Sequence, residues 1–148
     1  MILIKVTEVS APPAAIFRFF ETMEERYTEW HPDHVLFRWI HGRGLAEGNV
    51  FYFEEYIGGK LLKKEVRFTR IVPDEHMEFA PTFWLMRLFL PRKLFRVEAR
   101  EDGCRVVAEI HLRIGPLAAR LNRSELDAVR EHMRIEGVNL RRMVEAAE

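Results

Sequence analysis

Residues 124–147 read SELDAVREHMRIEGVNLRRMVEAA, and this stretch decides the fold. On a helical wheel of about 100° per residue, five apolar side chains fall within about 60° of Val129: Leu126, Met133, Leu140, Met143 and Val144. The arginines fall elsewhere on the wheel. The stretch therefore predicts a long C-terminal helix with one buried face. It should begin near Ser124, which can cap it with Asp127 three residues on.

Two ionisable residues lie within the apolar arc of this helix. Glu136 is nearly central and His132 is at the edge, and their spacing of four residues makes both side chains project the same way. A buried carboxylate without a partner costs several kcal/mol, so Glu136 should be neutral, paired with a cation or bound to a metal. An H-x-x-x-E pair commonly supplies two ligands to one divalent metal. The spacing alone favours the simpler alternative, a hydrogen-bonded His–Glu pair.

Upstream of the helix the sequence is rich in strand patterns. Alternating or β-branched runs predict strands at residues 2–9, 35–39, 50–57, 62–71, 76–80, 94–100 and 104–114. Gly58-Gly59 and Glu101-Asp102-Gly103 have the composition of hairpin turns. Strands that cluster, instead of alternating with helices, favour an antiparallel sheet. The sequence predicts an α+β fold in which a curved antiparallel sheet of about seven strands wraps around the C-terminal helix and an apolar cavity.

Between the first two strands the chain should form a helix and then a loop. Pro12 and Pro13 suit the first turn of a helix, because a missing N–H there leaves no hydrogen bond unmade. Residues 27–34, YTEWHPDH, are expected to be a loop, since Pro32 disfavours helix at the residue before it.

Composition limits the classes of function. The 148 residues are expected to form one domain, 1–148. Lys plus Arg and Asp plus Glu each number 23, and this balance argues against a nucleic-acid partner. No apolar run reaches the roughly 18 residues of a membrane span, and the N-terminus does not resemble a signal peptide. Cys104 is alone, which excludes an internal disulfide and a thiolate metal cluster. A cytoplasmic location is the expectation.

A second polar set lies near the start of the predicted sheet. His31 and His34 are in the loop before the second strand, and the strand VFYFEEYI carries Glu54 and Glu55. We prefer the register that turns Glu55 inward and Glu54 outward, because it buries the phenylalanines of that strand. One His and one Glu from this set could join the two helix residues in a four-ligand site. The pattern leaves His31 and His34 as alternatives.

Four motifs give the chain a family resemblance: IKVTEVSAPPAAIF (4–17), WHPDH (30–34), EYIGG (55–59) and HMRIEGVNL (132–140). With them the whole chain resembles the START-like, or helix-grip, superfamily, which includes polyketide cyclases, plant pollen allergens and lipid-transfer domains. The resemblance implies the helix-grip fold and a cavity for a small apolar or aromatic ligand.

Two of these regions are also similar to the diacetylphloroglucinol and phloretin hydrolases. Those larger enzymes hold zinc with two His and two Glu, and they cleave a carbon–carbon bond next to a ketone on a phenolic ring. The resemblance matches His34 to their first histidine, although the stretch here is one residue shorter between Pro and His. It also matches His132 and Glu136 to their H-x-x-x-E, and Glu55 to their strand glutamate. It implies a divalent metal, zinc, at these four residues.

Three functions compete. The first is a metal-dependent hydrolase of a small aromatic or polyketide-like ketone, in which the metal polarises a carbonyl or activates water. The second is a non-catalytic binding or transport domain for a small apolar ligand. In both, the ligand should contact a common set of aromatic side chains: Trp39, Phe51, Phe53, Phe68 and Trp84.

The third function is a membrane-touching module that uses the apolar residues 83–90. We prefer to interpret this stretch as a lid over the cavity, so membrane contact is not expected. Lys63 and Lys64 look like part of a solvated strand face, and Cys104 like a core residue. No nucleophile–base pair stands out, and the sequence assigns no catalytic residue.

Overall fold

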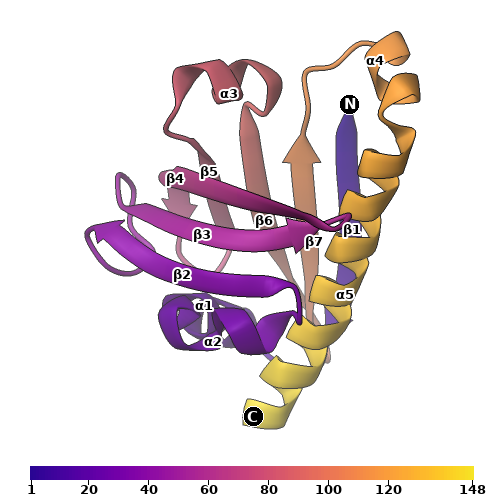
Figure 1. Ribbon diagram of the computed structural model, residues 1–148. Helices are drawn as coiled ribbons and strands as arrows, with labels where there is room; N and C mark the ends of the chain where they lie inside the picture. The colour runs from indigo at the N-terminus through magenta and orange to yellow at the C-terminus, as the bar shows by residue number, and fades with distance from the viewer.

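The computed structural model describes residues 1–148 and has one seven-stranded antiparallel sheet, in the order β1-β7-β6-β5-β4-β3-β2. Figure 1 shows the sheet curving around a long helix that runs along its open side. The predicted α+β, helix-grip fold is confirmed. The strands are β1 (Ile2–Val9), β2 (His34–His41), β3 (Val50–Ile57), β4 (Lys60–Val72), β5 (His76–Pro81), β6 (Arg92–Arg100) and β7 (Gly103–His111).

Two short helices carry the chain between the opposite edges of the sheet, from β1 to β2. They are α1 (Pro13–Glu21) and α2 (Met23–Trp30), and both lie at the lower end of the molecule in Figure 1. The expectation of a loop over residues 27–34 is wrong in its first half, because α2 continues to Trp30. The restriction that Pro32 imposes acts only on His31, whose extended backbone (ψ 136°) ends the helix.

Both predicted hairpins are present. Gly58 and Gly59 have φ values of +60° and +79°, as a two-residue turn with positive φ at both positions requires. They join β3 to β4, where Ile57 pairs with Lys60. At the other hairpin, Arg100 pairs with Gly103 across Glu101-Asp102.

The C-terminal helix α5 (Arg123–Ala147) lies against the concave side of the sheet, as the wheel predicts (Figure 1). Its buried residues are Leu126, His132, Met133, Gly137, Leu140, Met143 and Val144. Gly137 marks a close approach to β1, since a Cβ there would lie 2.6 Å from Thr7 Oγ1. The predicted Ser124 cap is absent: α5 begins at Arg123, and the Ser124 hydroxyl donates to the neighbouring Glu125 carboxylate. A six-residue helix, α4 (Pro116–Leu121), precedes it.

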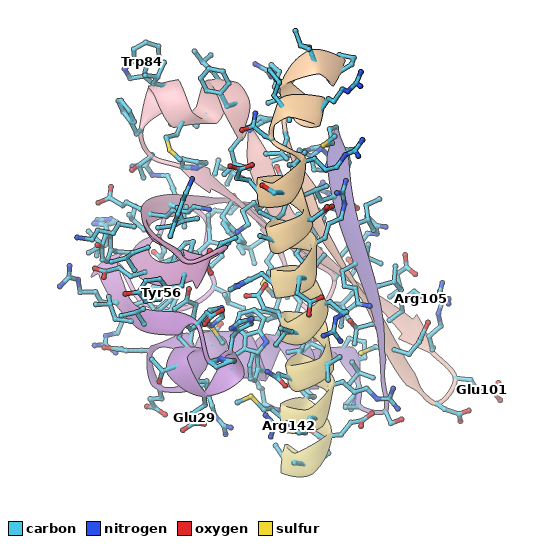
Figure 2. All side chains as sticks on the ribbon, turned by 45° about the vertical axis from the view of Figure 1, so that its right-hand side comes forward. Glu29, Tyr56, Trp84, Glu101, Arg105 and Arg142 are labelled. Atoms are coloured by element: carbon cyan, nitrogen blue, oxygen red, sulfur yellow. The ribbon has the colours of Figure 1, made fainter.

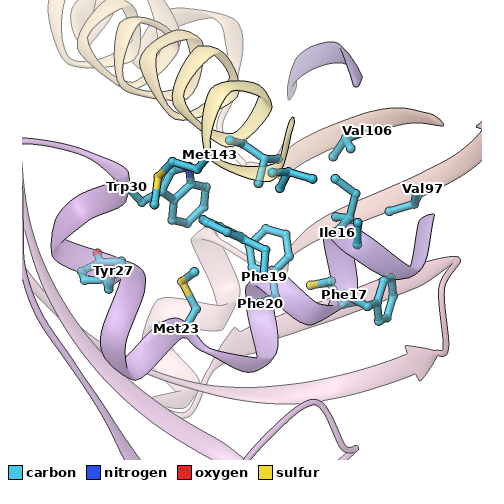
Figure 3. Packing of buried hydrophobic residues seen from close by; sticks show 14 of the residues in the cluster. Ile16, Phe17, Phe19, Phe20, Met23, Tyr27, Trp30, Val97, Val106 and Met143 are labelled. Atoms are coloured by element: carbon cyan, nitrogen blue, oxygen red, sulfur yellow. The ribbon is translucent and has the colours of Figure 1, made fainter. Parts of the chain in front are cut away.

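The largest core cluster lies between α1, α2, the sheet and the C-terminal half of α5. Phe19, Phe20 and Trp30 pack edge to face with ring centroids 5.4–5.6 Å apart, and Figure 3 shows them beneath α5. Edge-to-face pairs of this kind are worth about 0.5–1.5 kcal/mol each beyond the apolar area they bury. This packing fixes the end of α2, from which the chain enters β2. No helix is both long and apolar enough to cross a membrane.

Candidate metal centre

The junction between α2 and β2 is tied to α5 by hydrogen bonds. Trp30 Nε1 donates to the carbonyl of Glu136 (2.9 Å), and Asn139 Nδ2 donates to the carbonyl of Trp30 (2.8 Å). His34 begins β2, and its Nδ1 lies 2.8 Å from the carbonyl of Tyr27. Because a carbonyl only accepts, Nδ1 carries the hydrogen, and a neutral His34 ring turns the lone pair of Nε2 toward α5.

Four side chains from three elements, His34 among them, bring their ligand atoms together here. The atoms are Nε2 of His34 and His132 and Oε2 of Glu55 and Glu136, and all four lie within 4.8 Å of one another. His34 Nε2 lies 2.9 Å from Glu136, 3.2 Å from His132 and 3.6 Å from Glu55. His132 Nε2 lies 3.1 Å from Glu55 and 3.4 Å from Glu136.

These separations suit one tetrahedral ion. Donors placed 2.0–2.2 Å from a central zinc are about 3.3–3.6 Å from one another in a regular tetrahedron. The five distances above run from 2.9 to 3.6 Å. Lone-pair atoms this close repel unless a proton or a metal cation lies between them. The cluster is therefore built around positive charge.

Burial makes that positive charge necessary. The exposed fractions of the His34, Glu55 and His132 side chains are 0%, 4% and 6%, and that of Glu136 is 19%. Burial raises the pKa of Glu136, but the contact with His132 outweighs it and holds that pKa well below its usual range. Burial lowers the pKa of His132, yet Glu136 and Glu55 raise it overall to about 9. Without a metal, a proton on His132 balances part of the carboxylate charge.

His31, the alternative to His34, is 1% exposed and stacks on His132 with ring centroids 4.1 Å apart. Its nitrogens also approach those of His34 and His132. However, His31 Nδ1 accepts the backbone N–H of Asp33 (2.9 Å), so a neutral ring carries its hydrogen on Nε2, which has no hydrogen-bond partner. Burial, followed by the neighbouring histidines, lowers the pKa of His31 and keeps the ring neutral. This arrangement favours His34 as the ligand and His31 as support behind His132.

Tyr27 supports two of the four residues, and sequence reasoning gave it no role. Its hydroxyl donates to Glu55 Oε2 (3.2 Å), and its ring stacks on His34 at 3.9 Å and 6°. Burial, then the Glu55 charge, raises the pKa of Tyr27 well above its usual range, so the hydroxyl keeps its hydrogen. The available signal was its place three residues before Trp30, on the same face of α2.

In β3, Glu55 faces inward and Glu54 outward, which is the register preferred from the sequence. Glu55 is 3% exposed and faces the cluster, whereas Glu54 lies on the other face and accepts a hydrogen bond from Tyr52 (2.6 Å).

A cavity of about 230 Å³ lies beside the cluster, and 23 of its 30 lining residues are hydrophobic. Glu55, His132 and Glu136 form part of its wall, so a metal there would face the cavity. Four of the five predicted ligand-contact residues line it: Trp39, Phe51, Phe53 and Phe68.

Trp84 does not line the cavity, contrary to the sequence expectation. It lies on α3 (Trp84–Phe89), is 61% exposed and points away from the molecule in Figure 2. A six-residue helix with no buried residue gives the sequence no periodicity from which to infer an inward face. The expectation for Lys64 is also wrong, since this side chain and that of Lys93 line the cavity.

Comparison with solved structures shows a shared fold. TTHA0849 from Thermus thermophilus has a TM-score of 0.77 at 16% identity, covering 100% of this chain and 99% of its own. Ara h 8.0201 has a TM-score of 0.67 at 15% identity, covering 99% and 98%. The di-domain ARO/CYC BexL from the BE-7585A biosynthetic pathway has a TM-score of 0.72 at 15% identity, covering 98% of this chain and 50% of its own. No protein-family model and no curated protein sequence matches the chain.

Proposed function

We propose that this protein is a single helix-grip domain that holds zinc with His34, Glu55, His132 and Glu136 and hydrolyses a small aromatic ketone bound in the cavity. The observation that carries the proposal is the spacing of the four donor atoms, 2.9–3.6 Å for the five pairs given above.

The donor set suits zinc better than magnesium or calcium. Two imidazole nitrogens and two carboxylate oxygens match the ligands and coordination number of zinc, whereas magnesium and calcium prefer six or more oxygens. A divalent ion also neutralises the charges of Glu55 and Glu136 in a buried place. The hydrogen bond from His34 to the Tyr27 carbonyl and that from Tyr27 to Glu55 supply the outer support that metal ligands usually have.

The proposed hydrolysis needs both the metal centre and the apolar cavity beside it. With four protein ligands, a bound zinc ion would expand to five-coordinate to polarise a carbonyl or to lower the pKa of a coordinated water. The aromatic wall, including Phe51 and Phe53, would hold the ring of the ligand with its ketone toward Glu136, the most exposed of the four. In the hydrolysis the bond between the ring carbon and the acyl carbon breaks, the acyl carbon takes the oxygen of water, and the ring carbon takes a proton.

The second candidate is a carrier that binds the same ligand without chemistry. The apolar character of the lining favours it, since 23 of the 30 lining residues are hydrophobic.

Adjacent glutamates on β3 provide a matched test. Protein purified without chelators or a metal-affinity tag should contain about one zinc per chain, as a four-ligand site implies. Glu55→Gln should lower zinc affinity at least tenfold, whereas Glu54→Gln, on the outer face of the same strand, should leave it unchanged. Equal zinc affinity in the two variants would contradict the proposal. Zinc-loaded protein should also release a carboxylic acid from an acyl phenol. If it binds zinc but releases none, the carrier function replaces the hydrolase.

A further inference from the structure

Two lysines project from the sheet into the cavity. Lys64 on β4 pairs across the ladder with Phe53, and Lys93 on β6 pairs with Phe79. Directly paired residues share one face of a sheet, and both phenylalanines are buried on the concave side. Both lysines accordingly line the cavity, each of them half-buried.

Neither lysine has an anionic partner. The ammonium of Lys93 lies over the rings of Phe53 and Phe79, 5.7 and 5.6 Å from their centroids. Neither forms an ion pair, although a buried cation normally has one. Burial, and then the neighbouring charge of Lys93, lowers the pKa of Lys64 to about 8. Two cations thus face one largely apolar cavity, and the negative charges that act on Lys64 are those of Glu55 and Glu136.

The acidic residues of the cavity wall are already engaged. Glu109 accepts from Arg96 (2.7 Å) and lies 2.9 Å from His111, and Glu125 lies 3.9 Å from Lys60. The remaining two glutamates belong to the candidate metal centre, where a divalent ion would cancel their charge. A zinc-loaded cavity therefore carries two positive charges that nothing in the chain neutralises.

We propose that Lys64 and Lys93 form an anion subsite, and that the ligand is an aromatic molecule with an ionised oxygen, either a phenolate or a carboxylate. The inference rests on the proposed function for its metal and deepens it by naming the class of ligand. An anionic oxygen near the two ammonium groups would neutralise one of their two positive charges, while the ring packs on the phenylalanines beside them.

A pair of fluorescent probes tests the subsite. 8-Anilinonaphthalene-1-sulfonate is anionic, and N-phenyl-1-naphthylamine has the same rings without the sulfonate. In zinc-loaded protein, Lys64→Met and Lys93→Met should each weaken the anionic probe about tenfold or more, as expected for loss of a charged contact. The neutral probe should change less than about twofold, since Met keeps most of the apolar stem.

Lys63→Met is the control, because Lys63 is exposed on the opposite face of β4; it should change neither probe. If the lysine variants weaken both probes equally, or leave the anionic probe unaffected, the subsite is overturned. Repeating the titration with a chelator separates this failure from that of the metal. If the lysine variants lose the anionic probe selectively to the same extent with added zinc and with a chelator, the subsite stands and the metal is removed from the proposed function.

Displacement of the anionic probe distinguishes the two ligand classes. A hydroxyacetophenone that outcompetes its methyl ether, while 1-naphthoate does not compete, assigns a phenolate. Competition by 1-naphthoate alone assigns a carboxylate. If 1-naphthoate and the free phenol bind no better than neutral 1-acetonaphthone, the anion subsite is refuted.

Discussion

Zinc binding should release about one proton near pH 7, and His132 is the group that loses it. In the metal-free protein its contacts with Glu136 and Glu55 outweigh burial and raise its pKa to about 9. At pH 7, well below that pKa, most of the His132 rings are protonated. A histidine must be neutral to bind a metal, so zinc has to displace that proton from His132. The displacement costs about 3 kcal/mol, which weakens the apparent affinity for zinc roughly a hundredfold.

Calorimetry measures the proton directly. Zinc titrations at pH 7 in buffers with different enthalpies of ionisation should give a release of about one proton. The apparent dissociation constant should fall about tenfold per pH unit from 7 to 9 and then level off. His111→Ala, which removes a histidine outside the cluster, should leave both results unchanged. Zinc binding without proton release would refute the charge assignment, and so would a zinc affinity that does not change between pH 7 and pH 9.

In protein kept metal-free with a chelator, the free energy of unfolding should fall by up to about 3 kcal/mol as pH rises from about 6.5 to 9. The reason is that the pKa of His132 is higher in the folded than in the unfolded protein, so the folded state is stabilised only while His132 is protonated. Denaturant melts with the same free energy of unfolding across this pH range would contradict this. Tyr27→Phe should weaken zinc binding about 10- to 100-fold by removing the support of Glu55, and an unchanged affinity would leave Tyr27 a packing role alone. The lid interpretation of residues 81–91 predicts fast amide hydrogen exchange in the empty protein and slow exchange with ligand bound. Equal protection in both states would indicate a fixed segment instead.

The long helix and the inward glutamates could be predicted because, in each pattern, one choice of inward face buries the most apolar side chains. The apolar arc of α5 contains Glu136, and the alternation of β3 turns Glu55 inward with Phe51 and Phe53. The choice between His31 and His34 had no such basis. Both are buried beside one turn. The structure distinguishes them because His34 lies beside both glutamates, and because their hydrogen bonds differ, to Asp33 N–H for His31 and to the Tyr27 carbonyl for His34.

Other features needed the tertiary structure. Lys64 has the same parity as Val66 and Phe68, so the alternation of β4 placed it inward, but a charged side chain is normally assigned to solvent. Alternation in β1 predicts a strand without saying which face is covered. There α5 packs on the side of Leu3, and Ile4, on the other side, is 59% exposed.

Anomalous diffraction at the zinc edge, from crystals of protein purified without chelators, tests the central claim most directly. We expect one peak beside the cavity, about 2.0–2.2 Å from Nε2 of His34 and His132 and from a carboxylate oxygen of Glu55 and Glu136. A zinc-soaked crystal with no peak there, or with a peak bound by His31 in place of His34, would contradict the account.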